Sequence, residues 1–220
     1  IENDQRYSFV KGDIVDKEFL FQTLNSFNPD YIINFAAETH VDRSIHVGPQ
    51  EFISTNIWGV FSLLEYARQG SIKKYLQVST DEVYGSLPLD SEDKFTELTV
   101  LAPHNPYSAT KASGDLLSKA YYSSWKAPVV VTRSSNTFGP YQYPEKLIPF
   151  FVARLLEGKT LPLYGTGENV RSWLYVLDHC RALELCLLRG QSGEIYNIGA
   201  DVERSNLEIA RMILKYFGKD

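Results

Sequence analysis

Lys74-Tyr-Leu-Gln-Val-Ser-Thr-Asp-Glu82 decides the fold, because a short apolar run ends there in three polar residues. The apolar part predicts a buried strand over Lys74–Ser79. A long polar loop follows, and a helix begins at Asn105-Pro106 and extends to about Trp125. The β-branched run Pro128–Arg133 predicts the next strand. Strand, helix and strand in this order are typical of a parallel sheet.

The same alternation extends toward the N-terminus. We expect a strand, a helix, a second strand and a second helix there, and the second strand should be apolar on both faces, as in parallel sheets. Their ranges are Tyr7–Val10, Lys17–Phe27 behind the N-cap Asp16, Tyr31–Ala36, and Gln50–Arg68 ended by Gly70. The chain is therefore predicted to be an α/β protein with a Rossmann-like, doubly wound parallel sheet.

After Ser134 the rhythm of the sequence changes. A loop rich in Gly, Pro and Tyr is followed by shorter elements and by a capping box that opens the last helix. In order they are the loop Asn136–Pro144, a helix at Lys146–Leu156, strands at Leu161–Tyr164 and Arg171–Tyr175, a helix at Val176–Leu188, a strand at Glu194–Ile198, and the capping box Ser205–Glu208. We expect residues 134–220 to form a small, mixed α/β, substrate-facing part that interleaves with the last strands of the sheet.

Composition excludes several classes of protein. A net charge of -5 without a basic patch argues against a nucleic-acid partner. The sequence has neither an apolar run long enough to span a membrane nor a signal-peptide pattern. Cys180 and Cys186 are interpreted as reduced core residues of a cytoplasmic protein. The four histidines lack metal-ligand spacing, so we expect no metal site.

Polar residues follow the predicted strands at four successive ends. In an open parallel sheet, ligands bind beyond the carboxyl ends of the strands. The four stretches are Gly12-Asp13, Ala36-Ala-Glu-Thr-His40, Ser79-Thr-Asp-Glu82 and Ser134-Ser-Asn-Thr137. Each stretch alone could be an ordinary polar loop, but together they predict a site at this edge.

The spacing Tyr-x-x-x-Lys is a weak signal on its own, because it occurs three times in the sequence. The position of each pair relative to the predicted strand ends distinguishes them. The three pairs are Tyr7/Lys11, Tyr107/Lys111 and Tyr122/Lys126. The first is on a predicted strand, where four residues span about 13 Å. The third is at the far end of its helix. Only Tyr107 begins a helix near the strand ends, although a partly buried tyrosine beside a solvated lysine is the alternative.

Tyr107, Lys111 and the Asp81-Glu82 pair could share one reaction. The lysine and tyrosine lie on the same helix face, so the ammonium could stabilise a phenolate. Lowering a phenol pKa from about 10 to about 7 requires about 4 kcal/mol, which a charge at about 4–5 Å supplies at an effective dielectric constant of about 20. Adjacent carboxylates can divide acid and base roles if their environments separate their pKa values. Two solvated loop carboxylates are the alternative.

The Gly-rich turn of a dinucleotide-binding fold is missing from the 220 residues. Gly165-Thr-Gly167 lacks the third glycine and lies in the wrong half of the sequence. Either this protein does not bind a dinucleotide, or the segment that carries the turn lies outside the sequence.

Six segments together carry a family resemblance. They are Ala36–Ile45, Val78-Ser-Thr-Asp-Glu-Val-Tyr-Gly85, Asn105-Pro-Tyr-Ser-Ala-Thr-Lys111, Arg133–Pro149, Leu163–Tyr175 and Tyr196-Asn-Ile-Gly199. Across essentially the whole chain the sequence resembles the dTDP-glucose 4,6-dehydratases, which are extended short-chain dehydrogenases/reductases. The Tyr/Lys pair and Tyr-Asn-Ile-Gly are shared with related epimerases and decarboxylases. The Thr-Asp-Glu stretch is the discriminating element.

The resemblance implies a mechanism with dTDP-glucose as substrate and tightly held NAD as cofactor. Tyr107 takes the proton of the sugar 4-hydroxyl while a hydride leaves C4, and Thr80 contacts the same oxygen. Lys111 lowers the pKa of Tyr107 and holds the nicotinamide ribose. Glu82 removes the C5 proton as general base, protonated Asp81 gives its proton to the departing 6-hydroxyl, and the hydride returns to C6.

The resemblance also assigns binding residues. The cofactor positions, besides Tyr107 and Lys111, are Asp13, Ile14, Ala36, Ala37, Glu38, Thr55 and Thr137. The substrate positions are Thr39, Thr80, Asn136, Lys146, Leu147, Pro162, Tyr164, Arg171 and Asn206. Residues 1–133 would then be a partial NAD-binding domain and residues 134–220 the substrate-binding part.

Family members carry a strand, the Gly-rich turn, a helix and another strand before the segment that begins here, and that first strand lies between Tyr7–Val10 and Tyr31–Ala36. We therefore expect the sequence to be a piece of a longer protein, and this piece lacks the N-terminal βαβ segment. Whether this chain alone binds NAD is therefore left open. A homodimer through the helices at 50–68 and 105–125 is also expected. The alternatives are an NAD-dependent nucleotide-sugar epimerase or decarboxylase, and an inactive fragment or pseudoenzyme.

Overall fold

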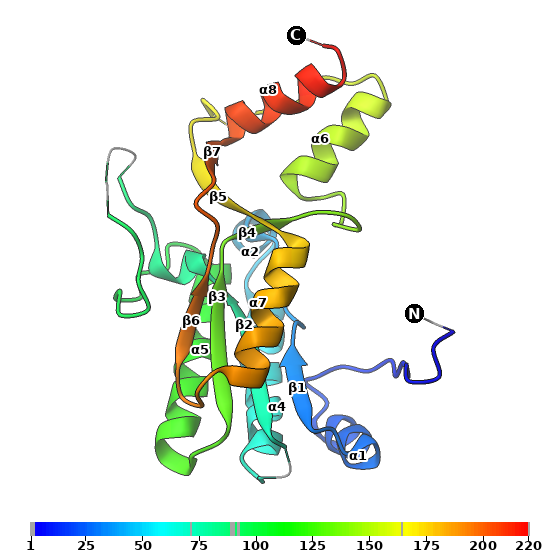
Figure 1. Cartoon of the computed structure of the whole chain (residues 1–220), viewed down its shortest axis with the longest axis vertical. Helices are drawn as coiled ribbons and strands as arrows, with labels where there is room; N and C mark the ends of the chain where they lie inside the picture. The colour runs from blue at the N-terminus through cyan, green and yellow to red at the C-terminus, as the bar shows by residue number, and fades with distance from the viewer. Residues whose placement is uncertain (1–2, 71, 89–90, 92, 164, 220) are drawn as a thin grey trace.

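A four-stranded parallel sheet forms the centre of the computed structural model, which describes residues 3–70, 72–88, 91, 93–163 and 165–219 (Figure 1). The strands lie in the order β1 (Tyr31–Asn34), β2 (Lys74–Thr80), β3 (Val129–Ser134) and β6 (Ile195–Ile198). Each neighbouring pair is parallel. The predicted Rossmann-like parallel sheet is thus confirmed.

Helices cover both faces of this sheet. On one face lie α1 (Lys17–Phe27), α4 (Val60–Ala67) and α5 (Pro106–Trp125). On the other lies α7 (Val176–Arg189), in front of the sheet in Figure 1. The turn before α4 consists of α3 (Gln50–Ile53) and the π-helical segment η1 (Ser54–Gly59), so the helix predicted over Gln50–Arg68 exists with an unpredicted π segment inside it.

Alternating side chains of the central strands build the two cores. Val129 and Val131 of β3 pack with the α4 and α5 side, whereas Val130 packs with α7. All six residues of β3 are buried. Strands buried on both faces read as continuous apolar runs, which is why β2 and β3 were visible in the sequence.

A second, three-stranded sheet continues beyond the carboxyl edge of the first (Figure 1). Strand β5 (Val170–Tyr175) pairs in parallel with β4 (Asn136–Phe138) and antiparallel with β7 (Glu203–Ser205). Helices α6 (Leu147–Leu156) and α8 (Asn206–Tyr216) lie beside it. The capping box at Ser205 and Glu208 is confirmed at the start of α8.

Some sequence predictions are wrong. Residues 7–10 form no strand, because a lone apolar run has no neighbouring strand with which to exchange backbone hydrogen bonds. Residues 161–163 likewise form no strand, and Tyr164 lies outside the described residues. Strand β1 is not buried on both faces, since Tyr31 and Ile33 are each 38% exposed. Cys180 is exposed on α7 rather than part of the core, whereas Cys186 is buried.

Four small elements were not predicted. They are the helix α2 (Val41–His46), the 3-10 turn η2 (Asp81–Tyr84) and the strands β4 and β7. Strand β4 occupies residues 136–138, the start of the segment predicted as a loop, because these residues pair with β5. Within the described ranges, no helix is long and apolar enough to cross a membrane. Nor do three or more His, Cys, Asp or Glu side chains gather there as a metal site.

Candidate active site

The carboxyl ends of β2 and β3 place the predicted acid and base residues. Thr80 and Ser134 are opposite each other in the last register position of the two strands. Thr80 is the N-cap of η2, and its Oγ1 accepts a hydrogen bond from the Glu82 amide at 3.3 Å. The same hydroxyl donates to Asp81 Oδ1 at 3.3 Å. The three residues Thr80, Asp81 and Glu82 therefore form one compact turn at the strand end.

The start of α5 lies against this turn. Asn105 caps the helix through its Oδ1, which accepts from the Ser108 amide at 2.8 Å. Its Nδ2 is 3.5 Å from Glu82 Oε2, at the limit of a hydrogen bond. Asn105 was predicted as a helix cap, and the structure adds that the cap also touches the predicted base.

Tyr107 and Lys111 are both buried on the inner face of α5, at 8% and 7% exposed. The Lys111 Nζ donates to the Val78 carbonyl at 2.7 Å, so this ammonium crosses to the end of β2. Burial lowers the pKa of Lys111 to about 8, and the negative field of Asp115 acts in the opposite direction.

The electrostatics of the site link the carboxylates with the tyrosine. Burial, and next the charge of Glu82, raise the pKa of Asp81 to about 6, while the charge of Arg171 opposes the rise. Burial also raises the pKa of Tyr107, with the charges of Glu82 and Asp81 adding to it and the Thr80 hydroxyl opposing it. The carboxylates and the phenol thus lie within reach of each other's fields.

Two consequences follow for acid–base chemistry. Asp81 keeps its proton to a higher pH than an ordinary aspartate, as a general acid requires. The sequence led us to expect that Lys111 lowers the pKa of Tyr107. The protein's own groups together raise this pKa instead. A phenolate at Tyr107 needs further positive charge nearby.

The predicted cofactor positions are held by local contacts. The Ala36 amide donates to Asn34 Oδ1 at 3.1 Å. Asn56 pins Glu38 from both sides, because its Oδ1 accepts from the Glu38 amide at 2.9 Å and its Nδ2 donates to the Glu38 carbonyl at 3.0 Å. Asn56 also donates to Thr110 Oγ1 at 3.0 Å and is 2% exposed.

Sequence reasoning missed Asn56. The signal that could have found it is an amide side chain in the middle of a helix next to apolar residues such as Ile57 and Trp58, since a buried amide needs partners. Of the other cofactor positions, Ala37 and Thr55 are half-buried, with Thr55 in the π-helical segment next to Asn56.

Asp13 and Ile14 are the first two predicted cofactor positions along the chain. Asp13 is exposed, and its Oδ1 accepts from the Val15 amide at 2.9 Å. Ile14 packs against Gly59, where a Cβ atom would come within 2.3 Å of the Ile14 side chain. Ile14 is therefore anchored to the helix that carries Thr55.

Some predicted substrate residues come together and others do not. Lys146 Nζ lies 3.3 Å from the Thr39 carbonyl as a hydrogen-bond donor, which joins two predicted positions across 107 residues. The positive field of Arg171 reaches Asp81. Asn136 lies on β4 opposite Trp173. Leu147 and Asn206 are instead the first residues of α6 and α8, and Pro162 is exposed in a loop.

Thr137 takes part in a buried cluster that the sequence did not reveal. His179 on α7 has Ser134 Oγ 2.7 Å from its Nε2 and Thr137 Oγ1 3.1 Å from its Nδ1. Burial lowers the pKa of His179, so the neutral ring is favoured. The cluster joins the Ser134 hydroxyl, at the carboxyl end of β3, to the Thr137 hydroxyl of β4 through one imidazole ring.

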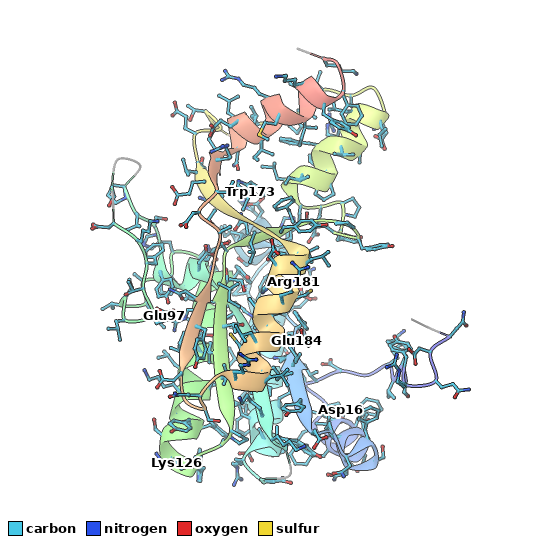
Figure 2. All side chains as sticks on the ribbon, in the orientation of Figure 1. Asp16, Glu97, Lys126, Trp173, Arg181 and Glu184 are labelled. Carbon is cyan, nitrogen blue, oxygen red and sulfur yellow. The ribbon has the colours of Figure 1, made fainter. Side chains whose placement is uncertain are left out.

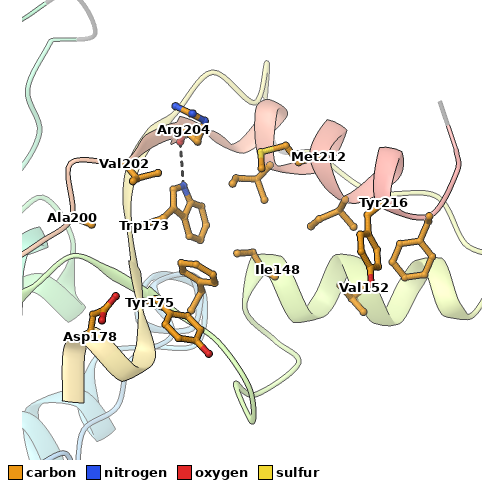
Figure 3. A pocket seen from close by; sticks show the side chains of 14 residues that line it. Ile148, Val152, Trp173, Tyr175, Asp178, Ala200, Val202, Arg204, Met212 and Tyr216 are labelled. Atoms are coloured by element: carbon orange, nitrogen blue, oxygen red, sulfur yellow. Dashed lines mark hydrogen bonds between the residues drawn. The ribbon is translucent and has the colours of Figure 1, made fainter. Parts of the chain in front are cut away.

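An apolar groove of about 580 Å³ lies between β5, α6 and α8 (Figure 3). The Trp173 indole faces it and donates from Nε1 to the Arg204 carbonyl at 3.3 Å. Its other lining includes Ile148, Val152 and Met212. Among the predicted catalytic and binding residues that the structure describes, none lines this groove, so it is distinct from the candidate active site that they form.

Fold and site together define an extended short-chain dehydrogenase/reductase: a parallel sheet, a helix that carries Tyr-x-x-x-Lys, and a carboxylate pair at the same edge. The chain belongs to the GDP-mannose 4,6-dehydratase family, whose model matches residues 1–219.

Similar proteins agree with this assignment. A low-salt glycan biosynthesis protein, Agl12, of Haloferax volcanii is 51% identical over 96% of this chain. A dTDP-glucose 4,6-dehydratase of Xanthomonas campestris is 46% identical over 97% of it. A crystal structure of dTDP-glucose 4,6-dehydratase from Bacillus anthracis in complex with NAD is 48% identical, with a TM-score of 0.91 over 100% of this chain and 67% of that one. The resemblance predicted from the motifs is confirmed.

The chain covers only part of the length of these relatives. The chain spans 66% of the length of the Haloferax protein and 62% of that of the Xanthomonas enzyme.

Proposed function

We propose that the whole protein is an NAD-dependent dTDP-glucose 4,6-dehydratase, which converts dTDP-glucose into the 4-keto-6-deoxy sugar nucleotide. The observation that carries this proposal is geometric: Asn105, which caps the helix of Tyr107 and Lys111, lies 3.5 Å from the Glu82 carboxylate, so the carboxylate turn is at the start of that helix. Oxidation at C4 alone needs only the tyrosine and lysine. The carboxylate pair supplies the acid and base that loss of water across C5–C6 requires.

The residues present fit the nicotinamide end of NAD. When bound, NAD supplies a two-electron acceptor for the hydride of C4 and gives that hydride back at C6. Lys111 and Tyr107 would hold and face this end, and Asn56 holds the Glu38 backbone, next to Ala36 and Ala37, through two hydrogen bonds. Asp13, Ile14, Thr55 and Thr137 complete the cofactor positions that we propose.

Tyr107 would exchange the proton of the 4-hydroxyl, and Thr80 would contact the same oxygen. Burial raises the pKa of Tyr107, so a phenolate there depends on added positive charge from the Lys111 ammonium and the oxidised nicotinamide. Because burial lowers the pKa of Lys111 to about 8, the nearby Asp115 helps to keep the ammonium charged at neutral pH.

The two carboxyl groups would divide the elimination between them. Asp81 remains protonated up to a pH of about 6 and would deliver its proton to the departing 6-hydroxyl. Glu82, held by Asn105 and by its own amide contact with Thr80, would accept the C5 proton. Different environments for adjacent carboxyls are what such a division of roles needs.

The remaining assignments concern the substrate, the assembly and the cell. Arg171 would bind the diphosphate through its guanidinium fork, and the other proposed substrate positions are Thr39, Asn136, Lys146, Leu147, Pro162, Tyr164 and Asn206. Residues 1–133 would bind the cofactor, and residues 134–220 would bind the substrate. A homodimer is supported by the exposed Trp58, Leu116 and Trp125 on η1 and α5. The two free thiols support a cytoplasmic location.

Product analysis tests the proposal. The whole protein, incubated with dTDP-glucose, should yield a sugar nucleotide lighter by one water, with a keto group at C4 and a methyl group at C6 in its NMR spectrum. A product of unchanged mass would indicate an epimerase. In a second incubation with a nucleotide-linked uronic acid, loss of carbon dioxide would indicate a decarboxylase. Either result would refute the proposed activity.

A further inference from the structure

The two halves of the candidate site come from separate parts of the chain. Asp81 and Glu82 lie on η2, whereas Tyr107 and Lys111 lie on α5, and a loop of some 20 residues joins them. Such a loop does not fix the distance between its ends. Besides the long contact between Asn105 Nδ2 and Glu82 Oε2 at 3.5 Å, a stronger connection is required if the acid, the base and the phenol are to keep one geometry.

A buried network behind the site makes this connection. Arg133 on β3 donates from Nε to Asp115 Oδ2 at 2.8 Å and from Nη1 to the Tyr84 hydroxyl at 2.9 Å. Arg133, Asp115 and Tyr84 are 4%, 2% and 3% exposed. Asp115 is one helical turn beyond Lys111 on α5, and Tyr84 is two residues beyond Glu82 on η2.

We infer that Tyr84, Arg133 and Asp115 are positioning residues that hold the carboxylate turn η2 at a fixed distance from the Tyr107–Lys111 face of α5. The inference rests on the proposed function, since it assigns these residues to the same reaction. It does not require any of the three to touch the substrate.

Tyr84 is fixed from several sides. Its ring lies 4.8 Å from the Arg133 guanidinium carbon and stacks on Phe95 with 5.0 Å between the ring centroids. Its hydroxyl donates to Asn197 Oδ1 at 2.7 Å, and the Asn197 amide donates to Glu97 Oε1 at 2.9 Å. Figure 2 shows Glu97 on the loop beside β6. The network therefore also holds Phe95 and Glu97, two residues of the connection between η2 and α5.

The charges in this network are difficult to rearrange. A buried ion pair holds its geometry because either partner alone would be an uncompensated charge in a medium of low dielectric constant. The Asp115–Arg133 pair is also close enough to Lys111 for its carboxylate to act on the ammonium. Lys111 thus has the Asp115 carboxylate as its charged neighbour on α5 and the Val78 carbonyl of β2 as its hydrogen-bond acceptor.

Tyr84→Phe tests the inference, because it removes the hydroxyl and keeps the ring. Tyr121→Phe is the matched control. Tyr121 is 6% exposed and lies on α5, the helix of Tyr107 and Lys111, and its hydroxyl donates to Glu65 Oε1 at 2.8 Å, away from the site. Both variants lose one buried hydroxyl. Only Tyr84→Phe should loosen the carboxylate turn.

The first readout separates the two chemical steps of the whole protein with dTDP-glucose. Tyr84→Phe should lower kcat about tenfold while oxidation at C4 changes less than about twofold, so that reduced nicotinamide accumulates during turnover. Tyr121→Phe should leave the ratio of the two steps unchanged. Unchanged turnover in Tyr84→Phe, or an equal loss of both steps, would overturn the inference.

The second readout does not depend on activity. In hydrogen–deuterium exchange, Tyr84→Phe should increase uptake in the peptide over residues 78–88, and Tyr121→Phe should not. Equal uptake in the two variants contradicts a positioning role. If the unmodified protein shows no dehydratase turnover, the proposed function fails, and the exchange result still decides whether Tyr84 holds η2.

Discussion

Asp81 is the residue on which the proposed acid chemistry depends most. Burial and the adjacent Glu82 raise its pKa to about 6. A raised pKa means that the folded protein keeps this proton as the pH rises past the ordinary range of an aspartate, and loses it only near pH 6. The donor form is therefore abundant below that pH and declines above it.

We predict a carboxyl group that titrates near pH 6 and is absent from Asp81→Asn. Infrared difference spectra of the protein, recorded across the acid range, would detect its carbonyl band. The kcat/KM of the unmodified enzyme should fall as the pH rises through the same value. Spectra without any carboxyl group that titrates above about pH 5 would contradict the assigned environment.

Among single residues, the sequence was enough to find those that belong to motifs, but not the buried residues that form hydrogen bonds behind them. Asp81, Glu82, Tyr107 and Lys111 were recognisable because short-range spacing places them at strand ends and on one helix face. The network partners Asp115 and Arg133 come from a helix and a strand and meet 18 residues apart. No local pattern indicates which buried carboxylate finds which buried guanidinium.

Among the elements, Glu65 ties three helices together. Its Oε1 accepts from Arg68 Nε at 2.6 Å and from the Tyr121 hydroxyl of α5 at 2.8 Å. Its Oε2 accepts from Lys17 of α1 at 3.3 Å. The Arg68 hydrogen bond is the main cause that lowers the pKa of Glu65 to about 2.

Because this pKa is depressed in the folded state, the stabilisation is present above the ordinary pKa and is lost as the pH falls toward about 2. Glu65→Gln should lower the free energy of unfolding by about 1–2 kcal/mol near neutral pH, a value reduced for solvent screening of the exposed partners, and by little near pH 2. Urea unfolding at both pH values measures this.

Glu184→Gln on the exposed side of α7 is the control for this prediction, and we expect a change below about 0.5 kcal/mol. An equal effect of Glu65→Gln at both pH values would show that packing rather than charge explains the contribution of Glu65.

Most elements followed from periodicity and caps, and the errors that concern strands have a common cause. Helices α1, α5 and α8 were predictable because Asp16, Asn105 and Ser205 cap them with side-chain hydrogen bonds. Strands depend on a partner that sequence does not display. The run at 7–10 has the composition of a strand but no neighbour, and β7 pairs with β5 although its sequence is polar.

The whole molecule exposes apolar surface at an edge of the sheet. Within the described part of the chain β1 pairs only with β2, and Tyr31, Ile33 and Phe35 are 38%, 38% and 61% exposed. An apolar edge strand is a site for association with another chain. We therefore expect a polypeptide of residues 1–220, prepared alone, to self-associate.

Ile33→Lys should reduce this association, because a charge on an edge strand opposes edge-to-edge pairing. Leu98→Lys is the matched control, since Leu98 is 93% exposed in a loop and gains the same charge away from the edge. Sedimentation velocity should show a shift toward monomer for Ile33→Lys only. The same shift in both variants would indicate net charge, rather than the edge, as the cause.

The central claim is that Tyr107 serves the oxidation while Asp81 and Glu82 serve the elimination, and one measurement tests it directly. The whole protein carrying Glu82→Gln is mixed rapidly with dTDP-glucose, and the absorbance of reduced nicotinamide is followed. We predict that this absorbance rises and persists without loss of water, whereas Tyr107→Phe produces no rise. Full turnover by Glu82→Gln, or an undiminished rise in Tyr107→Phe, would contradict the mechanism.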